Sequence, residues 1–177
     1  MPSTTTPLRT EVLPRPDSLV PPMAVDVPVT WVPTPATDAV LAGFMDDGTL
    51  SPAYGTNIVL TGAALPEGIG LEDWQITVRD RQLSALPDLQ VLDDRRLPAL
   101  GGDTSAEQWY HCSVMTDRHG ATVLTRRWNR LVPGLGLTLT LTTLPLLDAE
   151  HGDLFDAIAA SWTITEPTTE ERADDHA

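Results

Sequence analysis

The sequence predicts an α+β domain, an antiparallel β-sheet with two main helices packed on it. Segments with the two-residue periodicity of strands follow one another across short turns in the second half of the chain, which is typical of hairpins. Two other segments have the periodicity of helices. Because runs of strands separate the two helices, the order favours an antiparallel sheet over alternating strands and helices.

The first half of the chain predicts three strands and a helix. Segments rich in Val, Ile, Leu and Thr predict strands at 23–32, 39–44 and 57–63. A helix is expected at 70–86, because Leu71, Trp74 and Val78 recur at helical spacing and acidic residues lie in the first turn. Two further apolar side chains lie beside this stripe, Ile76 and Leu83. Pro87 ends the helix.

The second half predicts further strands and a second helix. The strands are expected at 89–92, 107–115, 121–131 and 135–143, the helix at 146–160 and a closing strand at 162–164. From Leu135 to Thr142 each leucine is followed by a glycine or a threonine. We therefore expect these leucines to face the core and the threonines to face the opposite side of the sheet.

The two ends of the chain differ in composition from this middle part. Proline is frequent in 1–22, which predicts an extended or disordered arm, because proline lacks a backbone N–H and disfavours helix before it. Residues 165–177 have an excess of acidic side chains and no large apolar one, which predicts a disordered acidic tail. We therefore expect one domain, at 23–164.

The charge balance excludes several functions. The chain has 177 residues, with 25 acidic side chains, 11 basic side chains that are all arginine, and a formal net charge of −14. Without lysine there is no Schiff-base lysine, no phosphate-loop lysine and no Ser–Lys dyad. We expect no binding to nucleic acid or to anionic membranes, because their phosphates must be neutralised by basic side chains.

Cysteine usage and the N-terminal segment predict a cytoplasmic protein. The single cysteine, Cys112, can form no internal disulfide and no multi-cysteine metal site, which fits a reducing compartment. The first 22 residues lack the charged and apolar regions of a signal peptide, and no stretch approaches the length of a spanning helix. The preference for arginine over lysine suggests a G+C-rich genome.

We expect no catalytic, cofactor-binding or metal-binding residue. His111 and Cys112 are neighbours on an expected strand, so they point to opposite faces and cannot pair as base and nucleophile. Cys112 is expected in the core, and His111 is expected to face outward or to pack on Trp109. The acidic segment at 148–153 contains a histidine but lacks metal-ligand spacing, and is expected to be a polar helix start. Since no nucleophile-elbow or phosphate-loop motif occurs, the sequence predicts that the protein is not an enzyme.

One arginine cluster favours a protein interface. Arg126, Trp128 and Arg130 are expected on one face of a single strand, and Arg127 on the other face. Arginine and tryptophan are enriched in the hot spots of protein interfaces, so the first three form the candidate interface. The alternative is that Trp128 lies on an ordinary outer face and is sheltered by the arginine stems.

Four segments carry a resemblance to a known family: 25–31, 55–61, 70–86 and 139–164. In this order they resemble the PsbP-like (Mog-type) fold, and within it the actinobacterial LpqN/LpqT-type lipoproteins. The resemblance implies an α/β/α sandwich and a non-enzymatic binding domain, with no catalytic residue to transfer. The signal peptide and the lipid-bearing cysteine of those lipoproteins have no counterpart here, so envelope anchoring is not implied.

Two functions follow from these expectations. The first is a soluble protein–protein adaptor or chaperone-like partner, bound to an unknown protein or to a second copy of itself as a homodimer. The alternative is a carrier or sensor of a small apolar ligand, with a pocket between a helix and the sheet. A large lined cavity would favour the carrier, whereas an exposed apolar patch or a dimer face would favour the adaptor.

Overall fold

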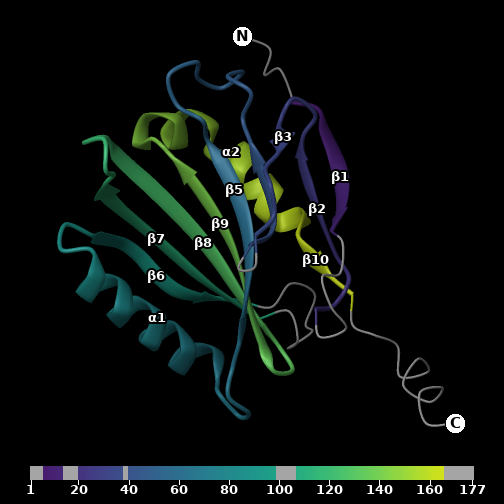
Figure 1. Ribbon diagram of the computed structural model, residues 1–177, viewed down its shortest axis with the longest axis vertical. Helices are drawn as coiled ribbons and strands as arrows, with labels where there is room; N and C mark the ends of the chain where they lie inside the picture. The colour runs from purple at the N-terminus through teal and green to yellow at the C-terminus, as the bar shows by residue number, and fades with distance from the viewer. Residues whose placement is uncertain (1–5, 14–19, 38–39, 99–106, 166–177) are drawn as a thin grey trace, which may run out of the picture.

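The computed structural model describes residues 6–13, 20–37, 40–98 and 107–165 (Figure 1). A three-stranded sheet has the order β1-β2-β10 and a seven-stranded sheet has the order β3-β4-β5-β9-β8-β7-β6, and the described strands pair antiparallel throughout. The strands are β1 (Leu8–Leu13), β2 (Met23–Pro28), β3 (Val32–Pro33), β4 (Val40–Met45), β5 (Asn57–Ala64), β6 (Gln90–Leu97), β7 (Gln108–Thr116), β8 (Thr122–Val132), β9 (Leu135–Thr143) and β10 (Thr163–Ile164). The helices are α1 (Leu71–Ala85) and α2 (Pro145–Ser161). The predicted α+β class, with two helices packed on antiparallel sheets, is confirmed.

The two helices lie on opposite faces of the large sheet (Figure 1). On β8, Arg126 pairs with Asp148 of α2, whereas the next residue, Arg127, donates to Gln82 of α1. Since neighbouring residues of a strand point to opposite faces, the two contacts place the helices on opposite sides. The small sheet and α2 together cover one face, and α1 covers part of the other.

The hydrophobic core lies on the α2 side of the large sheet. The predicted alternation in β9 is confirmed, because Leu137, Leu139 and Leu141 are no more than 1% exposed. Phe155 and Ile158 of α2 belong to the same buried cluster. Trp31, Trp162 and two valines of β2 are also fully buried there. Burial of this apolar area is the main driving force for folding.

One strand was not indicated by the sequence. Residues Leu8–Leu13, expected within an extended or disordered arm, form β1 and pair in full register with β2. The prolines of this region flank the segment but do not interrupt it, so its backbone N–H groups are available for a ladder. Arg9 also donates to the carbonyl of Trp31 at 2.7 Å. The folded part therefore begins before Met23.

Other boundaries differ from the expected ones. The segment 23–32 is divided between β2 and β3, and β6 runs to Leu97 rather than ending at 92. The second half of β6 is rich in charged residues, so its sequence did not predict a strand. The strand forms there because β6 lies at the edge of the sheet, where charged side chains are common. Apart from Thr165, the expected acidic tail lies outside the described residues, as do residues 1–5 and 14–19 of the expected arm and residue 39 of an expected strand.

Helix α1 is anchored at one end. Its buried residues are Leu71, Trp74 and Gln75, all in its first two turns. The Trp74 ring lies against the backbone of Gly136 in β9, where an added Cβ atom would come within 2.5 Å of Trp74 Cζ2. Ile76 and Leu83, expected beside the apolar stripe, are exposed. The C-terminal half of α1 is therefore only loosely covered by the sheet.

Within the described residues, no helix is both long enough and apolar enough to span a membrane.

Candidate functional site

The candidate interface of Arg126, Trp128 and Arg130 lies beneath α2. Trp128 is 5% exposed and belongs to the core, with its ring centroid 5.6 Å from that of Tyr110. Arg126 Nε lies 2.7 Å from Asp148 Oδ1. Arg130 donates to the carbonyl of Trp162 at 2.7 Å, and its guanidinium lies 4.5 Å from the centre of the Trp162 ring.

These three side chains form no exposed patch on the described chain. The sequence pattern placed them correctly on one face, but it could not show that a helix covers that face. The interface predicted at these residues is therefore corrected to a contact inside the fold. The two arginines attach α2 to the sheet, and a cation beside the last carbonyl groups of α2 also interacts favourably with the helix dipole.

The neighbours His111 and Cys112 point to opposite faces, as expected. Cys112 is buried and free, and burial raises the pKa of its thiol. His111 does not face outward, because it is only 2% exposed on the α1 side. Its Nδ1 lies 3.4 Å from Asp94 Oδ1 and its Nε2 has no partner. Asp94 also accepts from Trp109, so His111 and Trp109 share a carboxylate.

The acidic segment at 148–153 lies within α2, which begins at Pro145. Asp148 is held by Arg126, and His151 has non-helical angles at a kink of the helix, with φ −119° and ψ 16°. The described residues contain no group of three or more side chains arranged to hold a metal ion.

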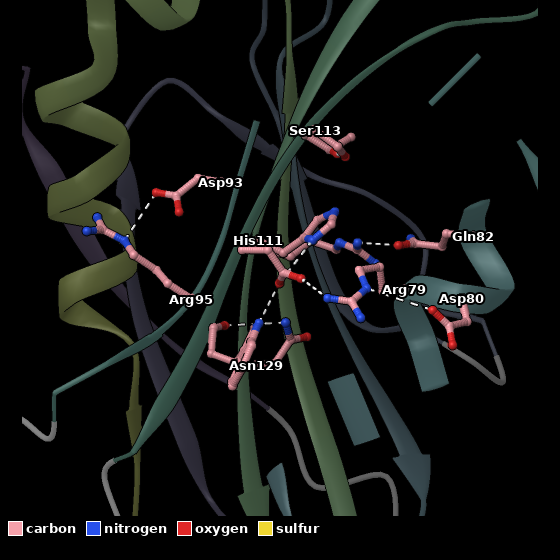
Figure 2. Close-up of polar contacts among 12 residues, drawn as sticks. Arg79, Asp80, Gln82, Asp93, Arg95, His111, Ser113 and Asn129 are labelled. Carbon is pink, nitrogen blue, oxygen red and sulfur yellow. Dashed lines mark hydrogen bonds and ion pairs between the residues drawn. The ribbon is translucent and has the colours of Figure 1, made fainter. Parts of the chain in front are cut away.

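A buried polar cluster lies on the opposite face of the sheet, beneath α1 (Figure 2). The strand register places Thr140, Arg127, His111 and Asp94 in one row across β9, β8, β7 and β6. Arg79 and Gln82 of α1 point toward this row, whereas Asp93 and Arg95 lie on the α2 side (Figure 2). The alternation of β8 thus sends Arg126 to one helix and Arg127 to the other.

Asp94 is the only carboxylate in this row. It accepts from Trp109 Nε1 at 2.5 Å and from Arg79 Nη1 at 2.8 Å. Burial raises the pKa of Asp94, but these hydrogen bonds outweigh it and hold the pKa below its usual range. Burial and the charge of Arg127 lower the pKa of His111, so this imidazole is neutral at physiological pH.

Arg127 is the unusual member of the cluster. Its side chain is nearly buried, since the residue is 8% exposed, and it donates to Gln82 Oε1 of α1. Its Nε has no hydrogen-bond partner, and no carboxylate lies within ion-pair distance of it among the described residues. Desolvation lowers the pKa of Arg127 to about 10, so the guanidinium stays charged near neutral pH.

A cavity of about 670 Å³ separates α1 from the sheet, and Arg127 lines it. Hydroxyl groups from β9, β8 and β7 form its floor, namely Thr138, Thr140, Thr142, Thr125 and Ser113. Trp74, Val78 and Gln82 of α1 lie over it. The cavity exists because α1 is anchored near its start and its later turns lie over a polar surface rather than an apolar one.

The sequence contained part of the signal for this site. The leucine–threonine alternation predicted that the threonines of β9 lie on the face opposite the core. The two-residue period of β8 placed Arg127 on the face opposite that of Arg126, Trp128 and Arg130, and the strand register brings it beside Thr140. What the sequence could not show is that α1 leaves this face partly open.

The buried His111 gives the protein a specific acid sensitivity. Because the pKa of His111 is lowered from 6.5, the unfolded chain takes up a proton that the native state refuses as the pH falls below that value. We expect the free energy of unfolding to fall as the pH drops below about 6.5, and His111→Asn to remove much of this fall. Urea unfolding at several pH values measures it. The exposed His119→Asn is the control, and equal slopes for wild type and His111→Asn would contradict the prediction.

A large antiparallel sheet with a helix on each face, and a small sheet beside one of them, defines a PsbP/Mog1-like fold. No protein-family model and no curated protein matches the sequence. Among solved structures, LpqN of Mycobacterium tuberculosis, described as involved in cell envelope biogenesis, is similar over 90% of this chain and 92% of that chain, with 19% identity and a TM-score of 0.66.

Two further solved structures are similar over most of their length. Cyanobacterial PsbP (CyanoP) of Synechocystis has 15% identity and a TM-score of 0.59, over 93% of this chain and 96% of that chain. The Ran-binding protein Mog1p of Saccharomyces cerevisiae has 9% identity and a TM-score of 0.58, over 89% of this chain and 96% of that chain. The predicted PsbP-like (Mog-type) resemblance is confirmed at the level of the fold.

Proposed function

We propose that the protein is a non-enzymatic binding module that holds a small ligand in the cavity between α1 and the large sheet. The cavity itself carries this proposal, because its volume of about 670 Å³ lies within the range of about 300–1,000 Å³ that is usual for small-molecule sites. Its lining combines apolar side chains with a few polar groups, which is typical of such sites. This supports the pocket that the sequence led us to consider as the alternative function.

The arrangement of reactive side chains favours binding over catalysis. Cys112 lies on the face away from the cavity, and His111, whose Nδ1 lies near Asp94, is not among the lining residues. The lining provides hydroxyl groups, but no acid–base pair that would activate one of them lies among the described lining residues. We also propose that the protein is cytoplasmic, as expected from its sequence.

Filling the cavity tests the proposal. We expect small neutral and anionic aromatic or aliphatic fragments to give saturation-transfer NMR signals with the wild type and to lose them in Thr140→Trp, because Thr140 lies on the cavity floor. Thr122→Trp is the matched control, since Thr122 is an exposed threonine at the start of β8 in the same sheet and does not line the cavity. Equal signals from both variants, or no signal from the wild type, would count against a ligand-binding cavity.

A second candidate function is the protein adaptor. Ile76 and Leu83 are exposed, and their spacing of seven residues places them on one outward stripe of α1. A similar fold occurs in a protein described as Ran-binding. A protein partner held by this stripe would be lost in Ile76→Glu while cavity binding stays unchanged, which separates the two candidates.

A further inference from the structure

The lining of the cavity differs in charge from the rest of the chain. The sequence has 25 acidic side chains against 11 arginines. The described lining nevertheless contains Arg127 and Arg81 and no Asp or Glu. A strongly acidic protein therefore has a positive lining on this cavity, and such a lining favours an anion.

The charge of Arg127 has no ion-pair partner among the described residues, and the charge of Asp94 acts on it only from beyond ion-pair distance. The residue is 8% exposed, and its Nε, which is buried, has no partner. The nearest acidic group in the strand row, Asp94, already accepts from Trp109 and Arg79. A buried cation without an ion pair is normally costly, and the cost is removed when an anion binds. The guanidinium fork also matches the two oxygens of a carboxylate.

Hydroxyl groups surround the place where the anion would lie. Thr140 is directly opposite Arg127 in the strand register. Thr125 and Ser113 lie in the next row, with their hydroxyl oxygens 2.9 Å apart. Each hydroxyl can rotate to donate to an anionic oxygen. The remaining lining includes Leu65, Ile69 and Trp74, which suit an apolar body.

We propose that the cavity binds a small amphiphilic monoanion, a carboxylate with an apolar body, and that Arg127 holds the carboxylate. This proposal rests on the proposed function and names its ligand class. One buried cation favours a single negative charge, since His111 beside it is neutral and Arg81 is exposed. A dianionic phosphate monoester would bring a second charge that the described lining does not balance.

Calorimetry with two probes of equal length tests the proposal. Sodium octanoate and octan-1-ol are titrated into the full chain. We expect octanoate to bind at least about tenfold more tightly than octanol, because only the carboxylate pairs with Arg127. Octyl phosphate, a dianion at high pH, is expected to bind more weakly than octanoate. Arg127→Gln is expected to bring the affinity for octanoate down to that for octanol, and Arg127→Lys to give an intermediate value, because it keeps the charge without the fork.

The control is Arg95→Gln, because Arg95 is an exposed arginine on the other face of the sheet. Its octanoate affinity should equal that of the wild type. Retained octanol binding by Arg127→Gln shows that this variant is folded. Equal affinity for octanoate and octanol, or unchanged octanoate affinity in both Arg127 variants, would overturn the anion inference and leave the cavity as a ligand site. If neither octanoate nor octanol bound, both the anion inference and the proposed ligand-binding function would be overturned.

Discussion

Trp74→Ala is expected to lower the free energy of unfolding by about 3–4 kcal/mol, as is usual when a buried aromatic side chain is removed. Trp74 is 5% exposed and lies against Gly136, and it is the largest of the three buried residues of α1. Because the later turns of α1 lie over the cavity, no other large side chain can replace this anchor. We therefore expect α1 to separate from the sheet before the rest of the protein unfolds.

Two measurements check this expectation. Urea unfolding gives the change in stability, and hydrogen exchange followed by mass spectrometry should show faster exchange in residues 71–85 than in β7, β8 and β9. Gly136→Val, which adds bulk on the sheet side of the same contact, should give the same exchange pattern. Ile76→Ala is the control on the same helix, since Ile76 is 39% exposed and its loss should change stability little. A Trp74→Ala variant no less stable than Ile76→Ala would contradict the anchoring role.

The strands and helices of the domain could be predicted largely from periodicity. The leucine–threonine alternation of β9 fixed which face is buried, and the burial of Leu137, Leu139 and Leu141 confirms it. Periodicity did not predict the strand residues whose structure depends on pairing with another strand. β1 is stabilised by its partner β2 rather than by its own composition, and β6 tolerates its charges because it is an edge strand.

The interface predicted at Arg126, Trp128 and Arg130 was wrong because a strand sequence does not show which of its faces a helix covers. Period two correctly separated Arg126, Trp128 and Arg130 from Arg127 on β8. Which face is covered depends on where the helices pack, and this is not contained in the strand. α2 seals the face of Trp128 with an apolar stripe and two ion pairs. α1 has few apolar side chains toward the sheet, so the face of Arg127 retains a cavity.

Arg127→Met and Arg130→Met are expected to change stability in opposite directions. Both arginines are buried on β8, and burial lowers the pKa of each to about 10 from 12.5. Desolvation is the main cause of both shifts, and for a shift of this size it costs the charged form about 3 kcal/mol. The shift is the same for both, so the difference depends on what each guanidinium contacts.

Arg130 has strong compensating contacts. Its Nη1 donates to the carbonyl of Trp162 at the end of α2, and its guanidinium stacks on the Trp162 ring. A charged hydrogen bond and a buried cation–π contact each contribute about 2 kcal/mol, which exceeds the desolvation cost. Removing this side chain also leaves a buried carbonyl unpaired. We expect Arg130→Met to lower the free energy of unfolding by about 2 kcal/mol.

Arg127 has one neutral acceptor, Gln82, an unpaired Nε and only the more distant charge of Asp94 to favour it, so much of its desolvation cost is uncompensated. We expect Arg127→Met to raise the free energy of unfolding by about 1–2 kcal/mol in the absence of ligand, as is found when buried charges are replaced by apolar side chains. Urea unfolding of both variants measures the two changes. A native protein keeps a destabilising buried charge when function requires it, and a gain in stability at Arg127 would support a binding role for that residue. If Arg127→Met were destabilised as much as Arg130→Met, the guanidinium of Arg127 would be compensated within the protein and would have no need of an anion.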